Sequence, residues 1–180
     1  MADPIRVPAL VVDASTALAL VRSEPHAPAV ERVLADHRRV SGRFLVPDAF
    51  WLEIANVLGR RYHGTASEVV ATLQDLDDLG LEDVRIERPL LLATIDIQAR
   101  YGLSAYDAAY LALAEAEDAR LLTLDERLAA AAGKRAARIE GWTPRRLAEE
   151  PATYESEPVD WSRFGPYLAR LRAEARSAAR

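Results

Sequence analysis

The stretch LSAYDAAYLALAEAEDARLLTLD, residues 103–125, decides the expected fold. Ser104 is a residue type that often caps a helix, and the mainly apolar segment after it predicts a helix that runs to about Glu117. The apolar run at residues 121–124 predicts a strand, and Asp125 begins an alanine-rich segment that predicts a short helix ending at Gly133. The stretch therefore predicts a helix, a buried strand and a second helix in direct succession.

The sequence on both sides of this stretch shows the same alternation of strands and helices. Further strands are predicted at residues 9–12, 44–46 and 84–86, and a fifth, at the edge of the sheet, at residues 136–139. Apolar residues at helical spacing predict helices at residues 14–21, 27–38, 48–64 and 65–79, and from Pro89 onward. Strands that alternate with helices favour a parallel sheet covered by helices. We therefore expect an α/β fold with a central parallel sheet of four or five strands.

The composition changes after Trp142. Acidic and proline-containing segments at residues 149–151 and 155–158 predict an exposed linker, and Pro166 opens a terminal helix that is apolar on one side. We therefore divide the chain into a domain at residues 1–142 and a C-terminal extension at residues 143–180. We expect the terminal helix to pack on the domain, with RNA or a partner protein as the alternative contact for its basic side chains.

Composition disfavours several kinds of site. The chain has no cysteine, which excludes disulfides, thiolate zinc sites and cysteine nucleophiles. The three histidines show no short metal-ligand spacing, and they are His26, His37 and His63. A net charge of -5 argues against nucleic-acid binding through bulk positive charge. The opening apolar run at residues 7–21 is interrupted by Asp13 and is too short to span a membrane, so we expect a soluble, cytoplasmic protein.

Four acidic residues lie where predicted strands lead into helices or early in a helix: Asp13, Glu53, Asp107 and Asp125. Ligands of open parallel sheets bind outside the carboxyl ends of the strands, so these side chains could face one crevice. Helix capping is the alternative for the aspartates, because two of them directly precede helices and Asp107 matches a capping box with Ser104. A solvated helix flank is the alternative for Glu53. Capping alone does not require Glu53, so the joint pattern favours a carboxylate site.

Four segments carry a resemblance to a known family. They are VVDAS at residues 11–15, VPDAFWLE at residues 46–53, LSAYDAAYLA at residues 103–112 and LTLD at residues 122–125. In this order they resemble the signatures of PIN domains over about residues 7–142, and in particular the toxin halves of bacterial VapBC-type toxin–antitoxin pairs. The resemblance implies a three-layer α/β/α PIN-like fold and a metal-dependent endoribonuclease. It also implies a small antitoxin partner and a homodimer.

The resemblance assigns roles to the site residues as well. It implies that the aspartates Asp13, Asp107 and Asp125 hold Mg²⁺ or Mn²⁺, that Glu53 binds the metal directly or through water, and that Ser15 and Thr123 orient ligands. Oxygen ligands are those that Mg²⁺ prefers, and bound metals can activate water for phosphodiester hydrolysis. Because a carboxylate crevice repels phosphate, RNA contacts are expected from basic residues elsewhere, and the candidates are Arg60, Arg61, Lys134, Arg135, Arg145 and Arg146.

Two other functions stay open at this point. A phosphatase that forms a phosphoaspartate would use Asp13 as its nucleophile, but such a site usually has a second aspartate two residues later, where this chain has Ser15. The only lysine in the chain is Lys134. A PIN-like scaffold that binds RNA or protein without cutting would be marked by lost carboxylates, and all four are present. The sequence has neither a P-loop nor a serine nucleophile elbow. We therefore favour the metal-dependent endoribonuclease, as the toxin of a toxin–antitoxin pair.

Overall fold

The computed structural model describes residues 7–143, which form an α/β fold around a sheet of four parallel strands. The strands lie in the order β3-β2-β1-β4, and they are β1 (Ala9–Val12), β2 (Arg43–Pro47), β3 (Leu81–Val84) and β4 (Arg120–Leu122). Val11 of β1 pairs with Leu45 of β2 on one side and with Leu121 of β4 on the other. This register brings the carboxyl ends of β1 and β4 next to each other.

Helices fill every connection between the strands. Those of the described residues are α1 (Ala14–Val21), α2 (Ala27–Arg39), α3 (Ala49–Asn56), a π-helix (Val57–Arg61), α4 (Ala66–Asp77), α5 (Arg88–Tyr101), α6 (Ala105–Ala116), α7 (Glu126–Ala132) and a 3-10 helix (Gly133–Arg135). Strands alternate with helices as the sequence predicts, which confirms the expected fold class.

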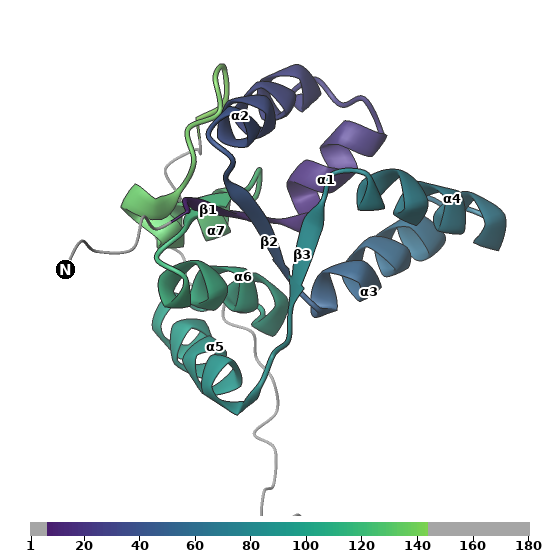
Figure 1. Cartoon of the computed structure of the whole chain (residues 1–180). Helices are drawn as coiled ribbons and strands as arrows, with labels where there is room; N and C mark the ends of the chain where they lie inside the picture. Colours follow the sequence, from purple (N-terminus) through teal and green to yellow (C-terminus); the bar gives the residue numbers. More distant parts are fainter. Residues whose placement is uncertain (1–6, 144–180) are drawn as a thin grey trace, which may run out of the picture. The chain divides into compact units, whose positions relative to one another are not determined.

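The order of the strands determines which face each helix covers. The chain moves outward from β1 through β2 to β3 and then crosses back to the opposite edge at β4. Parallel connections are right-handed, so the helices before this reversal cover one face of the sheet and the helices after β3 cover the other. Figure 1 shows α5 and α6 together on one side of the strands and α1 on the other. The reversal creates a topological switch point between β1 and β4.

The core lies around β1 and α6. Leu10, Val11 and Val12 are at most 2% exposed, because helices cover both faces of this central strand. In α6 every residue from Ala108 to Ala114 is buried. A helix that is apolar on all sides must be enclosed by protein, and α6 lies between the sheet and α5. A polar group within this buried stretch therefore needs a partner in the interior.

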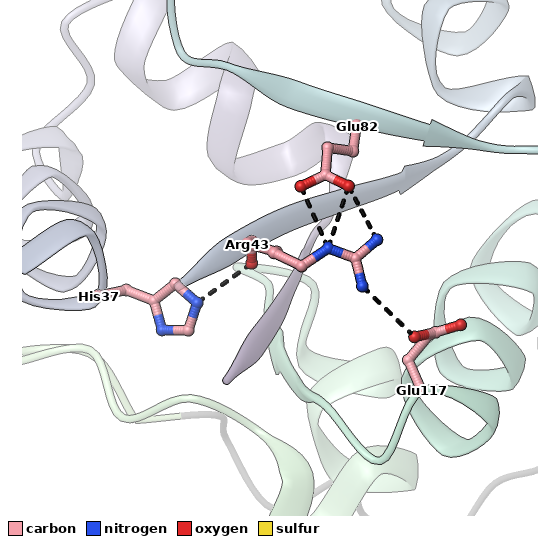
Figure 2. Close-up of polar contacts among 4 residues, drawn as sticks. All are labelled: His37, Arg43, Glu82 and Glu117. Carbon is pink, nitrogen blue, oxygen red and sulfur yellow. Dashed lines mark hydrogen bonds and ion pairs between the residues drawn. The ribbon is translucent and has the colours of Figure 1, made fainter. Parts of the chain in front are cut away.

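A polar cluster joins the strands at their amino ends, which Figure 2 shows. The Arg43 guanidinium donates to Glu82 of β3, with Nε to Oε2 at 3.0 Å and Nη2 to Oε2 at 2.8 Å. It also lies 3.9 Å from Glu117, just after α6, and the Arg43 carbonyl oxygen accepts a hydrogen bond from His37 Nε2 at 3.1 Å. The cluster ties the edge strand β3 to β2 and to α6, at the end of the sheet opposite the carboxyl ends of the strands.

Two strand predictions were wrong in detail. The third strand was expected at residues 84–86 but occupies Leu81–Val84, beginning directly after Gly80, which has a φ of +68°. It is an edge strand whose middle residues are exposed and acidic, so it lacks the apolar run that marks a buried strand. The fifth strand expected at residues 136–139 is only an isolated bridge between Leu121 and Ala136.

Aspartate is a common helix cap, but Asp48 does not cap α3. Asp48 precedes α3 with helical backbone angles, and its side chain makes no capping hydrogen bond. Thr65, by contrast, forms a complete capping box with Glu68 at the start of α4. The expected extension at residues 143–180 lies almost entirely outside the described residues, and its helix remains a prediction. Within residues 7–143, no helix has the length and apolar character needed to cross a membrane.

Candidate active site

The carboxyl ends of β1 and β4 form the switch point of the sheet, where open α/β folds bind their ligands. Asp13 directly follows β1, and its backbone N–H donates to Leu122 O of β4 at 3.0 Å. Asp125 lies three residues after the end of β4 and caps α7. The strand order therefore places two of the four predicted acidic residues at one crevice.

Asp13 is a buried carboxylate with a dense set of hydrogen bonds. Its side chain is 3% exposed, and Oδ2 accepts hydrogen bonds from the Thr123 hydroxyl at 2.7 Å, from the Ser15 hydroxyl and from the Ser15 backbone N–H at 3.3 Å. Burial raises the pKa of Asp13 to about 6, the bonds from Ser15 and Thr123 oppose this rise, and the charges of Asp107 and Asp125 add to it. All three bonds go to Oδ2, which leaves Oδ1 for a ligand.

Ser15 and Thr123 hold the two strand ends together. The Ser15 hydroxyl accepts a hydrogen bond from the Leu124 backbone N–H at 2.9 Å, while the Thr123 hydroxyl accepts one from the Asp125 backbone N–H at 2.9 Å. Each hydroxyl thus donates to Asp13 and accepts from the segment after β4. The sequence prediction that these two residues orient the site is consistent with this geometry.

Asp125 caps α7, as the capping alternative predicted, whereas the carboxylate of Asp107 bonds to the hydroxyl of Ser104, the residue that caps α6. Asp125 Oδ1 accepts a hydrogen bond from the Leu128 N–H at 2.7 Å, and Asp107 Oδ2 accepts one from the Ser104 hydroxyl at 2.7 Å. Burial raises the pKa of Asp107, and the charge of Asp125 adds to this effect. Each of these hydrogen bonds uses one carboxylate oxygen, so the other oxygen of the same residue remains available for a ligand.

Glu53 reaches the same crevice from α3 and is not a solvated flank residue. The Tyr110 hydroxyl donates a hydrogen bond to Glu53 Oε2 at 2.7 Å. Burial raises the pKa of Glu53 to about 7, the Tyr110 bond opposes the rise, and the charges of Asp13, Asp107 and Asp125 add to it. Every pair among the four acidic residues is close enough for one charge to affect another. The structure therefore brings all four predicted residues together.

Tyr110 is the site residue that the sequence reasoning missed. Burial, followed by the charges of Asp13 and Glu53, raises the pKa of Tyr110 far above its ordinary value, so its hydroxyl keeps its proton. The sequence did contain a signal, because Tyr110 lies three residues after Asp107 and so on the same side of α6. A tyrosine in an otherwise apolar helix needs a partner for its hydroxyl.

The donor set fits a hard divalent cation. It consists of carboxylate and hydroxyl oxygens, and the like charges of the carboxylates repel one another unless protons or a cation offset them. Within residues 7–143, no three acidic or histidine side chains already lie close enough together to hold one ion. Mg²⁺ usually keeps several waters and binds one or two carboxylates directly, so such an arrangement suits Mg²⁺ with the remaining acidic residues bound through water.

The predicted RNA contacts fall into three groups. Arg60 and Arg61 are exposed on the π-helix that follows α3, and Lys134 is exposed after α7. Arg135 instead donates to Asp118 Oδ1 at 3.0 Å and to the Ala119 carbonyl oxygen at 3.2 Å, which gives it a structural role. The remaining candidates lie outside the described residues, and they are Arg145 and Arg146.

Comparisons with known proteins agree with this arrangement. The sequence model of the PIN domain family matches residues 10–134. PAE2754 from Pyrobaculum aerophilum is 23% identical, with a TM-score of 0.53 over 73% of this chain and 83% of that one. VapC20 from Mycobacterium tuberculosis, described as a toxin that cleaves the sarcin-ricin loop, is 18% identical, with a TM-score of 0.55 over 68% of this chain and 94% of that one.

A third similar structure is VapBC2 from Rickettsia felis, bound to a DNA fragment from its promoter. It is 10% identical, with a TM-score of 0.54 over 65% of this chain and 88% of that one. At these identities the three structures show a shared fold. The search of curated proteins gave no match.

Proposed function

Since the chain belongs to the PIN domain family, we propose that it is a metal-dependent endoribonuclease that hydrolyses RNA phosphodiester bonds. The observation that carries the proposal is the convergence of four carboxylates from separate elements at the switch point of the sheet. They are Asp13, Glu53, Asp107 and Asp125, and mutual repulsion contributes to raised pKa values in three of them. Nothing in helix capping or core packing requires such repulsion, which a bound cation would relieve.

The residues that we propose to hold Mg²⁺ or Mn²⁺ are Asp13, Asp107 and Asp125, together with Glu53. One or two of them would bind the metal directly and the others through water. A metal at this place would supply Lewis acidity for a phosphate oxygen and lower the pKa of bound water. The hydroxyls of Ser15 and Thr123 fix Asp13 by Oδ2, so that Oδ1 keeps one direction.

The biological setting we propose is that of a toxin restrained by a small antitoxin. One of the similar structures is described as a toxin that cleaves the sarcin-ricin loop, and another as VapBC2 bound to a DNA fragment from its promoter. We also propose a homodimer and a cytoplasmic location, on the same family grounds. We propose that Arg60 and Arg61, which are exposed on the π-helix after α3, contact the RNA backbone.

The experiment is cleavage of a pool of structured RNAs by the purified full chain, with Mg²⁺, with Mn²⁺ or with chelator. Asp107→Asn should abolish cleavage, because it removes one carboxylate charge from the crevice. Asp96→Asn is the matched control, since Asp96 lies exposed on α5 and pairs with Arg100. Cleavage that survives in chelator, or equally in Asp107→Asn, would refute the proposal.

The second candidate is a PIN-like scaffold that binds RNA without cutting it. The same experiment separates the two, because a scaffold would retard the RNA pool in a binding assay and leave it intact with every metal. A phosphoaspartate phosphatase is disfavoured by the site itself. In such an enzyme a carboxylate oxygen of Asp13 would attack the phosphate, but Oδ2 of Asp13 already accepts three hydrogen bonds. The only lysine of the chain, Lys134, is exposed in the 3-10 helix after α7.

A further inference from the structure

The four acidic residues of the crevice share a pattern in how they are held. Three of them are fixed at one carboxylate oxygen by a group two or three residues away: Asp13 by Ser15, Asp107 by Ser104, and Asp125 by the Leu128 N–H. Asp13 also accepts a hydrogen bond from the distant Thr123. In each case the other oxygen is left for a ligand. These aspartates can be fixed locally because they lie at helix starts, where unpaired backbone N–H groups and capping hydroxyls are available.

Glu53 has no such local group, because it lies within α3 where the backbone N–H groups already bond within the helix. Its side chain is also longer than that of aspartate and loses more rotamer freedom when it is fixed. The partner that fixes it comes from a distant part of the chain. Tyr110 of α6, 57 residues later, donates its hydroxyl proton to Oε2 at 2.7 Å.

We propose that Tyr110 is a positioning residue for the metal site, which holds Glu53 by Oε2 so that Oε1 faces the cation. The inference rests on the proposed function, since it assumes that the crevice binds a divalent metal. It assigns to Tyr110 the role that Ser104, Ser15 and Thr123 have for the other acidic residues.

The surroundings of Tyr110 support this role over simple core packing. Its side chain is 1% exposed, and α6 is buried from Ala108 to Ala114. A phenylalanine would fill almost the same volume in this apolar helix without a hydroxyl that must be bonded. The Tyr110 hydroxyl bonds to Glu53 of α3, which is the acidic residue of the four that has no partner within a few residues of itself. Because Asp107 lies one turn earlier on the same helix, α6 sets the positions of both Asp107 and Glu53.

The test compares Tyr110→Phe with the matched control Tyr106→Phe in the full chain. Tyr106 lies one turn earlier on α6 and is 57% exposed. We measure Mn²⁺ affinity by calorimetric titration and thermal stability without metal. Loss of an outer-shell partner typically weakens metal binding about 10-fold to 100-fold, so Tyr110→Phe should raise the Mn²⁺ dissociation constant by at least about 10-fold. Tyr106→Phe should leave the constant unchanged.

A double-mutant cycle distinguishes positioning from a general structural effect. If Tyr110 acts through Glu53, Tyr110→Phe should weaken Mn²⁺ binding in the wild-type chain but cause no further loss in a Glu53→Gln background. In RNA cleavage, Tyr110→Phe should raise the metal concentration for half-maximal rate while the KM for RNA stays the same.

The outcomes separate this inference from the proposed function. If the wild-type chain binds Mn²⁺ and cuts RNA but Tyr110→Phe binds Mn²⁺ equally well, the positioning role is wrong and the nuclease stands. An equal loss of affinity in the Glu53→Gln background also overturns the positioning role, because Tyr110 would then act on the whole site. If the wild-type chain binds no Mn²⁺, both proposals fail.

Discussion

Replacing Asp13 by asparagine should make the metal-free protein more stable at alkaline pH. Asp13 is 3% exposed, and its pKa is raised from 3.8 to about 6, chiefly by burial. The folded state therefore binds this proton more tightly than the unfolded state does. Stability from this group is fully present below pH 3.8 and is lost as the pH rises through about 6. Asparagine is neutral in both states and avoids the loss.

The size of the effect follows from the pKa. At about 1.4 kcal/mol per pH unit, a rise from 3.8 to about 6 corresponds to roughly 3 kcal/mol lost at pH 8. The asparagine side-chain oxygen can accept the bonds that Ser15 and Thr123 now donate to Oδ2, and asparagine caps helices as well as aspartate does. Asp13→Asn should therefore gain up to about 3 kcal/mol at pH 8, or about 10 °C in Tm, and almost nothing near pH 4.

The assay is denaturant unfolding of wild type and Asp13→Asn in chelator at pH 4, 6 and 8. Asp96→Asn, on the exposed side of α5, serves as the control and should change the free energy of unfolding little at any of these pH values. A gain in Asp13→Asn that is the same at pH 4 and pH 8 would show that the buried charge is not its source. Absence of any gain at pH 8 would refute the reasoning entirely.

Three further predictions concern the same structure. Mg²⁺ should raise the Tm of the wild-type chain at pH 8 but not at pH 4.5, and it should not raise the Tm of Asp13→Asn, because the ion binds ionised carboxylates. Differential scanning fluorimetry measures these shifts, and equal shifts in all samples would contradict the prediction. Thr123→Val should lower the free energy of urea unfolding by about 1 to 3 kcal/mol and reduce RNA cleavage, because it removes a hydrogen bond to the buried Asp13. Unchanged cleavage would argue against an orienting role for Thr123. Arg43→Gln should lower the free energy of unfolding by less than about 1 kcal/mol, because the ion pair with Glu82 is half-exposed. RNA cleavage should stay at the wild-type rate. A loss of cleavage would mean that a change at the amino ends of the strands affects the acidic residues at their carboxyl ends.

The parts of the fold that the sequence predicted well are those whose local pattern and tertiary environment agree. The helix from Ser104 and the strands β1 and β4 consist mainly of buried apolar residues, so the sequence shows each of them as an apolar run. The edge strand β3 begins three residues before the predicted strand. The sequence did not indicate this, because Glu82 and Asp83 are exposed and do not belong to an apolar run. Edge strands depend on pairing with a neighbour, which a single stretch of sequence does not display.

For the candidate site, the sequence supplied the acidic residues but not their support. Asp13, Asp107 and Asp125 could be found because each follows a recognisable strand or capping signal. The Tyr110 bond to Glu53 joins residues 57 positions apart, and only the packing of α6 against the sheet brings them together. Helix capping and membership of the acidic cluster were posed as alternatives for each aspartate, yet Asp125 caps α7 and still lies near the other three acidic residues.

This double use of the aspartates has an evolutionary consequence. One base change converts an aspartate codon to an asparagine codon, and asparagine is as good a helix cap as aspartate. Such a change at Asp13 or Asp125 would remove a carboxylate from the crevice while keeping the helix start intact. Lineages that gain nothing from the proposed activity would thus lose it in one step and still produce a folded protein. Descendants of this kind would be recognised by intact caps and missing charges, and their surfaces would remain available for selection on binding alone.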